Sequence, residues 1–153
     1  PGDVCLPGGM VEEGEAPREA ALRELQEELL LNKDQICYLG DTDKLYTGSS
    51  LIMYSFAAEV TEYQNTFSPT EVDEVFCVPL EFFLHTEPKC YVTYAKVEPG
   101  ENFPYELICG GREYNWRRRK EEVCFYQYEG HVIWGLTAKM MRAFVNIVKN
   151  LQM

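Results

Sequence analysis

The sequence predicts one domain over residues 1–153, of the α/β or α+β sandwich class. A length of 153 residues is typical of a single domain. Apolar residues make up 46% of the chain, which is enough for a core, and the 25% of residues that are charged can cover its surface. Short runs with strand character are separated by few helical segments, and this order favours packed layers of helix and sheet.

Two segments have the pattern of longer helices. Residues 18–29 consist largely of strong helix formers, and Pro17 stands where the first helical turn would begin and where its missing N–H costs nothing. Residues 137–151 form an amphipathic helix near the C-terminal end, for which Gly135 or Thr137 is the expected cap. We expect its apolar stripe to lie in the core; the stripe consists of Leu136, Met140, Phe144, Ile147 and Leu151.

The apolar runs between these helices have strand character, because they are rich in aromatic and β-branched residues. A short helix is expected over residues 79–84. The expected strands are residues 36–39, 51–60, 72–78, 91–97, 105–109 and 123–128.

The charge of the chain limits its partners. A net charge of −11 argues against a nucleic-acid backbone as a partner. No apolar run approaches the roughly 18 residues of a membrane span, and the opening residues lack the apolar region of a signal peptide, so we expect no membrane partner and a cytoplasmic location. A small anionic substrate remains compatible with the charge, because carboxylates can hold metal ions that attract phosphates.

The six cysteines are widely spaced and form no C-x-x-C pair. We therefore expect neither a zinc site nor a disulfide framework. Most are expected to be buried free thiols, which suits a reducing cytoplasm. They are Cys5, Cys37, Cys77, Cys90, Cys109 and Cys124.

The helix over residues 18–29 gathers carboxylates on one face. At about 100° per residue, Glu27 and Glu28 fall on either side of Glu24, whereas the leucines of the helix lie on another arc. Like charges at this spacing repel each other, and hard divalent cations, which prefer oxygen ligands, remove the repulsion. The face suits metal-assisted attack of water on a phosphate. The alternative is a solvated acidic surface.

The loop before this helix favours the metal site. The whole segment resembles the Nudix box, G-x5-E-x7-R-E-U-x-E-E-x-G-U, in which U is a bulky apolar residue. The matching residues are Gly9, Glu15, Arg23, Glu24, Leu25, Glu27, Glu28 and Leu31. Leu30 replaces the late glycine, whose positive φ a leucine adopts poorly, so we expect Asn32 to end the helix instead.

The resemblance implies an α/β/α sandwich around a mixed sheet, with the loop–helix–loop of the box near its start and an amphipathic helix at its end. It also implies Mg²⁺ or Mn²⁺ as the cofactor. Glu27 and Glu28 would bind the metal directly, and Glu24 would be a further ligand or the base that activates water. Arg23 would orient Glu24 through an ion pair.

The same resemblance gives supporting roles to the loop. Glu15 would fix the loop or contribute to a second metal shell, and Gly9 would support the loop. The backbone carbonyl of Gly8 or Gly9 would complete the coordination. Nudix domains normally place strands before the box, so we expect that one or more upstream strands of the fold are missing from these residues. A homodimer is compatible with the family.

Three further segments are similar to the coenzyme A pyrophosphatase subfamily. Residues 4–9 resemble its V-x-F-P-G-G motif, residues 75–80 its E-V-F-x-V-P-L motif, and residues 129–138 its Y-x-I-W-G-L-T-A motif. The implied reaction converts CoA or acyl-CoA, with water, to phosphopantetheine and adenosine 3′,5′-bisphosphate. Hydrolysis of ADP-ribose, a dinucleotide or a nucleoside triphosphate is the alternative. A non-catalytic nucleotide-binding module is a further one, disfavoured because Arg23, Glu24, Glu27 and Glu28 are all present.

Other residues carry weaker signals. Arg117 and Arg119 belong to the one basic run of the chain, which is either a solvated loop or a contact for substrate phosphates such as the 3′-phosphate of CoA. His131 is expected to be structural. Trp116 and Trp134 are candidates for stacking on adenine, although Trp134 lies in an apolar run and is expected in the core. A further metal-binding carboxylate outside the box would come from Glu71, Asp73, Glu74, Glu121 or Glu122.

Overall fold

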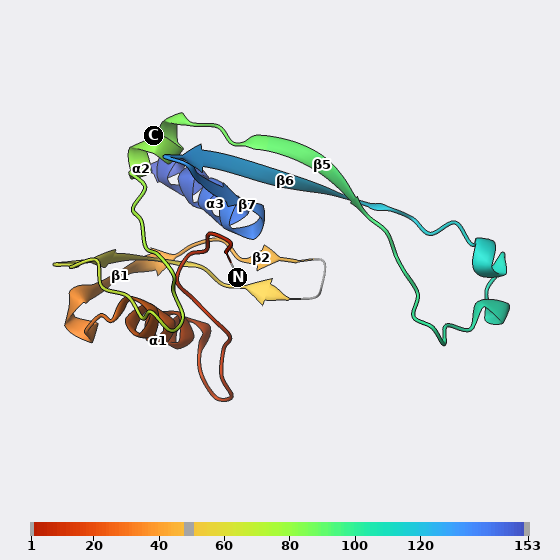
Figure 1. The fold of residues 1–153 in the computed structure, drawn as a ribbon, viewed down its shortest axis with the longest axis horizontal. Helices are drawn as coiled ribbons and strands as arrows, with labels where there is room; N and C mark the ends of the chain where they lie inside the picture. Colours follow the sequence, from red (N-terminus) through yellow and green to blue (C-terminus); the bar gives the residue numbers. More distant parts are fainter. Residues whose placement is uncertain (1, 48–50, 152–153) are drawn as a thin grey trace.

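The computed structural model describes residues 2–47 and 51–151 (Figure 1). The first part of the chain contains one α-helix and two antiparallel strand pairs. These elements are α1 (Pro17–Leu29), the 3-10 turn η1 (Lys33–Gln35), β1 (Ile36–Asp41), β2 (Leu45–Tyr46), β3 (Ile52–Met53) and β4 (Phe56–Val60). The second part contains α2 (Leu80–His85), β5 (Lys89–Ala95), the 3-10 turns η2 (Tyr105–Leu107) and η3 (Gly111–Glu113), β6 (Arg119–Tyr128), β7 (His131–Trp134) and α3 (Gly135–Leu151).

The strands of the described residues form three antiparallel sheets. β1 pairs with β4, β2 with β3, and β5, β6 and β7 form a sheet in that order. The α/β prediction is confirmed, whereas the described ranges contain no parallel strand pair of the kind that a mixed sheet requires. A short turn fixes the antiparallel direction of β6 and β7, because Glu129 and Gly130 both have positive φ, as two-residue hairpins need.

The core lies between α3 and one face of the β5–β6–β7 sheet. Cys124 and Tyr126 of β6, Ile133 of β7, and Ala138 and Val145 of α3 are all buried in one cluster. Phe83 of α2 closes this cluster and meets the Tyr126 ring edge-on, at a centroid distance of 5.1 Å. This edge-to-face arrangement is the favoured geometry for aromatic pairs.

The packed face of α3 differs from the predicted stripe. Leu136 and Leu151, at the two ends of that stripe, are exposed. The buried positions are instead Thr137, Ala138 and Val145. Small residues face the sheet because they let the helix approach it closely, and the spacing rule alone does not choose between two adjacent apolar arcs.

Two predicted strands are not strands. Residues 72–78 belong to a connection that crosses the end of α1, where the Ser68 N–H donates to the Glu28 carbonyl at 2.8 Å and the Thr66 hydroxyl donates to the Leu29 carbonyl at 2.7 Å. Residues 105–109 follow Pro104 and form the tight turn η2, in which the Leu107 N–H donates to the Pro104 carbonyl. The predicted strand over residues 51–60 is broken into β3 and β4.

Residues 91–122 form an arm that extends away from the rest of the molecule (Figure 1). β5 and the first part of β6 are its two strands, and the residues between them form its tip. No residue of the arm is buried. Its tip is held by an aromatic cluster whose rings meet at steep angles, formed by Phe103, Tyr105, Tyr114 and Trp116.

The prediction that most cysteines are buried free thiols was wrong. Cys90 of β5 and Cys124 of β6 are bonded as a disulfide at the base of the arm. The register places these two residues directly opposite each other, with their Cα atoms 4.0 Å apart, and sequence spacing does not reveal this register. The other four cysteines are free and exposed rather than buried. None of the helices in the described ranges is long and apolar enough to cross a membrane.

Candidate active site

Helix α1 presents the carboxylates of the box. It begins at Pro17, and the Ala16 N–H that would otherwise lack a partner donates to the Glu19 carboxylate at 3.0 Å. Its far end differs from the prediction, because Leu30 and not Asn32 adopts the left-handed conformation, with φ 53° and ψ 43°. Asn32 has extended backbone and begins η1. The conformation at Leu30 is imposed by the chain reversal there, since the Leu31 N–H donates to the Gln26 carbonyl.

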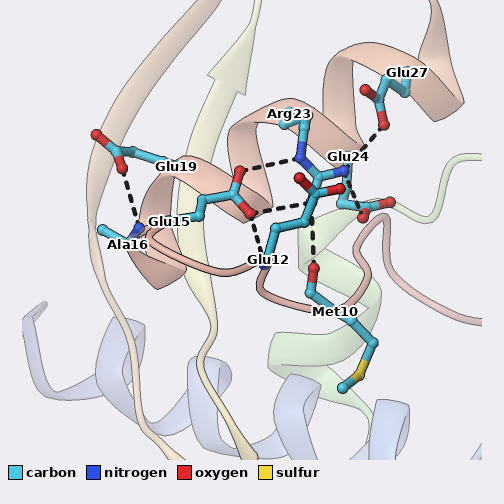
Figure 2. Close-up of polar contacts among 8 residues, drawn as sticks. All are labelled: Met10, Glu12, Glu15, Ala16, Glu19, Arg23, Glu24 and Glu27. Atoms are coloured by element: carbon cyan, nitrogen blue, oxygen red, sulfur yellow. Dashed lines mark hydrogen bonds and ion pairs between the residues drawn. The ribbon is translucent and has the colours of Figure 1, made fainter.

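Arg23 is the centre of the site (Figure 2). Its Nε and Nη2 donate to the two oxygens of Glu15, at 3.0 and 3.2 Å. Its Nη1 donates to Glu24 at 2.8 Å and to Glu27 at 3.1 Å, and Nη2 also reaches the Met10 carbonyl. One planar guanidinium thus joins three carboxylates and the loop, which the fixed fork of an arginine allows and a lysine ammonium does not.

These contacts change the titration of the pair. The hydrogen bonds from Arg23 hold the pKa of Glu15 below its usual range, with help from a bond donated by the loop backbone. The Glu12 N–H donates this bond to the Glu15 carboxylate at 3.1 Å. The same carboxylates raise the pKa of Arg23, with Glu15 the largest cause. Glu15 therefore stays ionised and ties the glycine-rich loop to α1.

Glu28 has a different environment from the three carboxylates on Arg23. Partial burial raises its pKa, and the charges of Glu24 and Glu71 raise it further. The Gly8 N–H opposes this shift by donating to the Glu28 carboxylate at 3.0 Å. Glu28 is consequently a carboxylate with the negative charges of Glu24 and Glu71 nearby, and no cationic side chain is among its bonded partners in the described ranges.

Gly9 lies against the carboxylate of Glu24. A Cβ atom at position 9 would overlap this carboxylate, so any other residue would push Glu24 away from its present place. The close approach, and not a special backbone conformation, explains why the loop needs a glycine here.

Glu71 is the carboxylate outside the box that comes near the site. It follows Ser68 in the connection that crosses the end of α1, and the Glu71 N–H donates to the Ser68 carbonyl in a turn. This placement makes its charge act on Glu28. The hydrogen bond from the Ser68 N–H to the last turn of α1 brings Glu71 here, and the local sequence does not predict this contact.

The other carboxylate candidates are engaged elsewhere or exposed. Glu121 pairs with Arg119 within β6, and Glu122 pairs with Arg142 of α3 at 2.7 Å. Asp73 and Glu74 are exposed in the connection. Glu122 also lies beside the sulfur atoms of Cys90 and Cys124, but these atoms are bonded to each other and Arg142 occupies the same space, which excludes a cation there.

The structure does not bring Arg117 and Arg119 to the box. Arg119 begins β6 and Arg117 precedes it, so both belong to the arm, which extends away from α1 in Figure 1. Trp134 was expected in the core, but 42% of its surface is exposed. His131 stacks on the Phe76 ring at a centroid distance of 3.8 Å, which is a packing contact.

The donor set around α1 fits a hard divalent cation. Glu24, Glu27, Glu28 and Glu71 offer carboxylate oxygens, the ligand type that Mg²⁺ and Mn²⁺ prefer. Partial burial is the largest cause of the raised pKa of Glu28, and the charges of Glu24 and Glu71 add to it, so the protein alone disfavours the ionised form. A bound cation would favour that ionised form.

Comparisons with known proteins agree with this site. The chain matches the NUDIX domain family over residues 1–96. A Mus musculus protein named peroxisomal coenzyme A diphosphatase NUDT7 is 35% identical over 112 residues, which are 67% of this chain and 44% of that protein. Peroxisomal coenzyme A diphosphatase ndx-8 of Caenorhabditis elegans is 35% identical over 89 residues, 55% of this chain and 38% of its own length.

A third relative covers almost the whole chain. It is a Photorhabdus laumondii protein named uncharacterized Nudix hydrolase NudL, 25% identical over 150 residues, which are 97% of this chain and 70% of that protein. The chain spans less than half the length of the two coenzyme A diphosphatases that it matches. The matched family region takes up more than half of the chain and contains the complete site around Arg23, and the chain therefore belongs to the Nudix domain family.

Proposed function

We propose that the chain hydrolyses the diphosphate linkage of CoA or acyl-CoA to give phosphopantetheine and adenosine 3′,5′-bisphosphate, with Mg²⁺ or Mn²⁺ as cofactor. The observation that carries the reaction is the carboxylate cluster of α1, in which Arg23 binds three carboxylates and Glu28 is left without a cation. Two relatives named coenzyme A diphosphatases support the substrate.

The carboxylates of the site would bind the metal. Glu27 and Glu28 would hold the metal, with Glu24 and the Gly8 carbonyl as further ligands, and Glu71 is placed to contribute from the neighbouring connection. When bound, a divalent cation polarises phosphate oxygens and makes water more acidic. It would also offset the negative charge that the acidic chain presents to a phosphate.

Glu24 is the group that we propose to accept a proton from the attacking water. The oxygen of that water forms a bond to one phosphorus, the bond from this phosphorus to the bridging oxygen breaks, and the bridging oxygen leaves with the other phosphate. Arg23 holds Glu24 by the 2.8 Å ion pair and so fixes the direction of its carboxylate. Gly9 leaves the room that this carboxylate needs.

The test is to incubate the protein with Mg²⁺ or Mn²⁺ and one of four substrates: CoA, ADP-ribose, NADH or a nucleoside triphosphate. Products are identified by mass. We expect phosphopantetheine and adenosine 3′,5′-bisphosphate from CoA, and a loss of about a hundredfold or more in kcat for Glu27→Gln. Glu81→Gln on α2 is the matched control, since it removes an exposed carboxylate from another helix.

The outcomes separate the alternatives. Turnover of ADP-ribose, NADH or a triphosphate without turnover of CoA would overturn the substrate and keep the reaction class. No turnover of any of them, with Glu27→Gln equal to wild type, would leave only a binding module.

Arg117 and Arg119 are proposed contacts for the 3′-phosphate of CoA. The position of both residues on the arm requires the substrate to extend toward the β5–β6 strands. We expect Arg117→Ala and Arg119→Ala to raise the KM for CoA more than the KM for dephospho-CoA. Equal effects on both substrates would remove this role.

A further inference from the structure

The outer face of the β5–β6–β7 sheet carries an aromatic surface that the core does not use. Side chains alternate along strands, so Cys124, Tyr126 and Ile133 point toward α3 while their neighbours point away from it. The neighbours include Tyr91, Phe125 and Trp134, which we call the aromatic platform. Tyr91 is 59% exposed and Trp134 42% exposed.

The rings of the platform form one continuous surface. Phe125 and Trp134 face each other across β6 and β7 with nearly parallel rings, 6° apart in orientation and 5.8 Å between centroids. Tyr91 meets the other side of Phe125 edge-on, also at 5.8 Å. These rings line a hollow of about 680 Å³, within the range of small-molecule sites, together with Lys89, Thr93 and Val123.

A cation stands at the edge of the platform. Lys89 lies directly opposite Phe125 in the β5–β6 pairing. It forms no ion pair within the described part of the chain, whereas Glu87, which lines the same hollow, is 3.6 Å from Lys149. Flat rings beside an unpaired ammonium match the chemistry of a nucleotide, whose base can stack and whose phosphate carries negative charge.

The platform is connected to the box by a short segment. The Trp134 Nε1 donates to the Asp3 carboxylate at 3.1 Å, and the Thr137 hydroxyl donates to the Val4 carbonyl at 3.0 Å. Five residues later, the Gly8 N–H binds Glu28. Five residues span at most about 18 Å when fully extended. This length is an upper limit on the separation between Asp3, which binds Trp134, and Gly8, which binds Glu28.

We infer that the aromatic platform binds the purine ring of a nucleotide, with Lys89 as the contact for its phosphate. This inference rests on the proposed function, because the nucleotide is taken to be one end of the substrate whose diphosphate is split at the box. It adds Lys89, which lies in the same hollow as the rings, to the phosphate contacts proposed for Arg117 and Arg119.

The test measures nucleotide binding in EDTA, so that it does not depend on catalysis. The Trp116→Phe background leaves Trp134 as the one tryptophan of the chain. AMP and adenosine should change its fluorescence, and ribose 5-phosphate should not. Tyr91→Ala should weaken AMP binding roughly tenfold, the usual loss for one stacked base. Tyr94→Ala is the matched control, because Tyr94 is a similarly exposed tyrosine on the opposite face of β5.

Two more variants separate stacking from structure and from charge. Trp134→Phe keeps a ring but loses the bond to Asp3, so calorimetry should show AMP binding retained, whereas Trp134→Ala should lose it. Lys89→Met should weaken the binding of AMP and leave that of adenosine unchanged. Unchanged Trp134 fluorescence with AMP, or equal effects of Tyr91→Ala and Tyr94→Ala, would overturn the inference.

The failure of this inference differs from the failure of the proposed function. If AMP binds the platform in the Glu27→Gln protein but no substrate is hydrolysed, the reaction is wrong and the platform stands. If CoA is hydrolysed and Tyr91→Ala leaves its KM unchanged, the platform is wrong and the reaction stands. If the platform instead joins two copies of the chain, Tyr91→Ala should change the sedimentation of the protein and leave AMP binding intact. This result would also overturn the inference.

Discussion

The box and the arm are stabilised in opposite ways. In the box, one side chain, Arg23, connects residues that lie within 13 positions of it, because its three nitrogens donate to five oxygen atoms of four residues. In the arm, two strands pair over a long distance in sequence and no residue is buried. Polar geometry fixes the first region, whereas the second depends on strand pairing, a disulfide at its base and aromatic contacts at its tip.

The difference shows how a small acidic chain can keep a charged site rigid. The carboxylates of the box cannot be buried without cost, so they are held at the surface by charge-assisted hydrogen bonds that need no core. The strands of the arm contain no buried residue, and a disulfide joins them at their base. The box should therefore be sensitive to the geometry of single side chains, and the arm to its one cross-link.

The largest expected effect concerns that cross-link. Replacing Cys90 and Cys124 together by serine should lower the free energy of unfolding by about 3–4 kcal/mol, because the bond closes a separation of 34 residues. Denaturant unfolding with and without a thiol reductant measures the loss. Cys37→Ser, at an exposed free cysteine, is the control. Titration of six free thiols in the folded, untreated protein would contradict the bond.

The next effect concerns the fork of Arg23. Arg23→Lys keeps the charge but cannot bind Glu15 with two nitrogens while it also holds Glu24, so hydrolysis of CoA should fall by roughly ten- to a hundredfold. The apparent affinity for Mn²⁺, followed by calorimetry, should fall with it. Arg18→Lys on the same helix is the matched control. Equal activity of both variants would mean that charge alone matters in the box.

A smaller gain is expected where α1 ends. Leu30 is 55% exposed and has positive φ, so Leu30→Gly removes the strain of a side chain in the left-handed region. After the entropy that glycine adds to the unfolded chain, the gain should be about 0.5–1 kcal/mol. Leu30→Ala, which keeps a Cβ atom, should show no such gain in thermal unfolding. If both variants lose stability equally, the leucine side chain contributes packing there.

The smallest effect is a pH dependence at Glu28. Its pKa is raised in the folded protein, so the folded state disfavours the ionised form and stability is lost as the pH rises above the ordinary glutamate pKa of about 4.3. In EDTA at neutral pH, Glu28→Gln should therefore raise Tm by about 1–2 °C, since solvent screens part of the effect. The gain should vanish in acid, and Glu81→Gln should show none.

The sequence predicted the parts of the molecule whose causes are local. The extent of α1 follows from helix formers behind Pro17, and the family follows from the spacing of Gly9, Glu15 and Arg23. α2, β1, β5 and the second half of β6 were also predicted near their observed positions. In each case the decisive residues lie within about one element of each other.

What the sequence did not predict depends on distant pairing. Predicting the Cys90–Cys124 bond requires the β5–β6 register. Predicting the exposure of Trp134 requires knowing which face of the sheet α3 covers. Residues 72–78 have strand composition, but the backbone before them is bonded to the end of α1. The position of Glu71 beside Glu28 arises from that same crossing, which connects two segments 43 positions apart.

Gly9 has a consequence for how this chain can vary. Any side chain at position 9 would displace the Glu24 carboxylate from Arg23 without disturbing the backbone, because Gly9 has no positive φ and the overlapping atoms belong to a flexible side chain. Mutants at this position would thus fold as the wild type does, and a screen for stability would not detect them. Selection for catalytic activity would retain glycine at position 9. The residue at position 30, at the other end of the same segment, is instead constrained by folding.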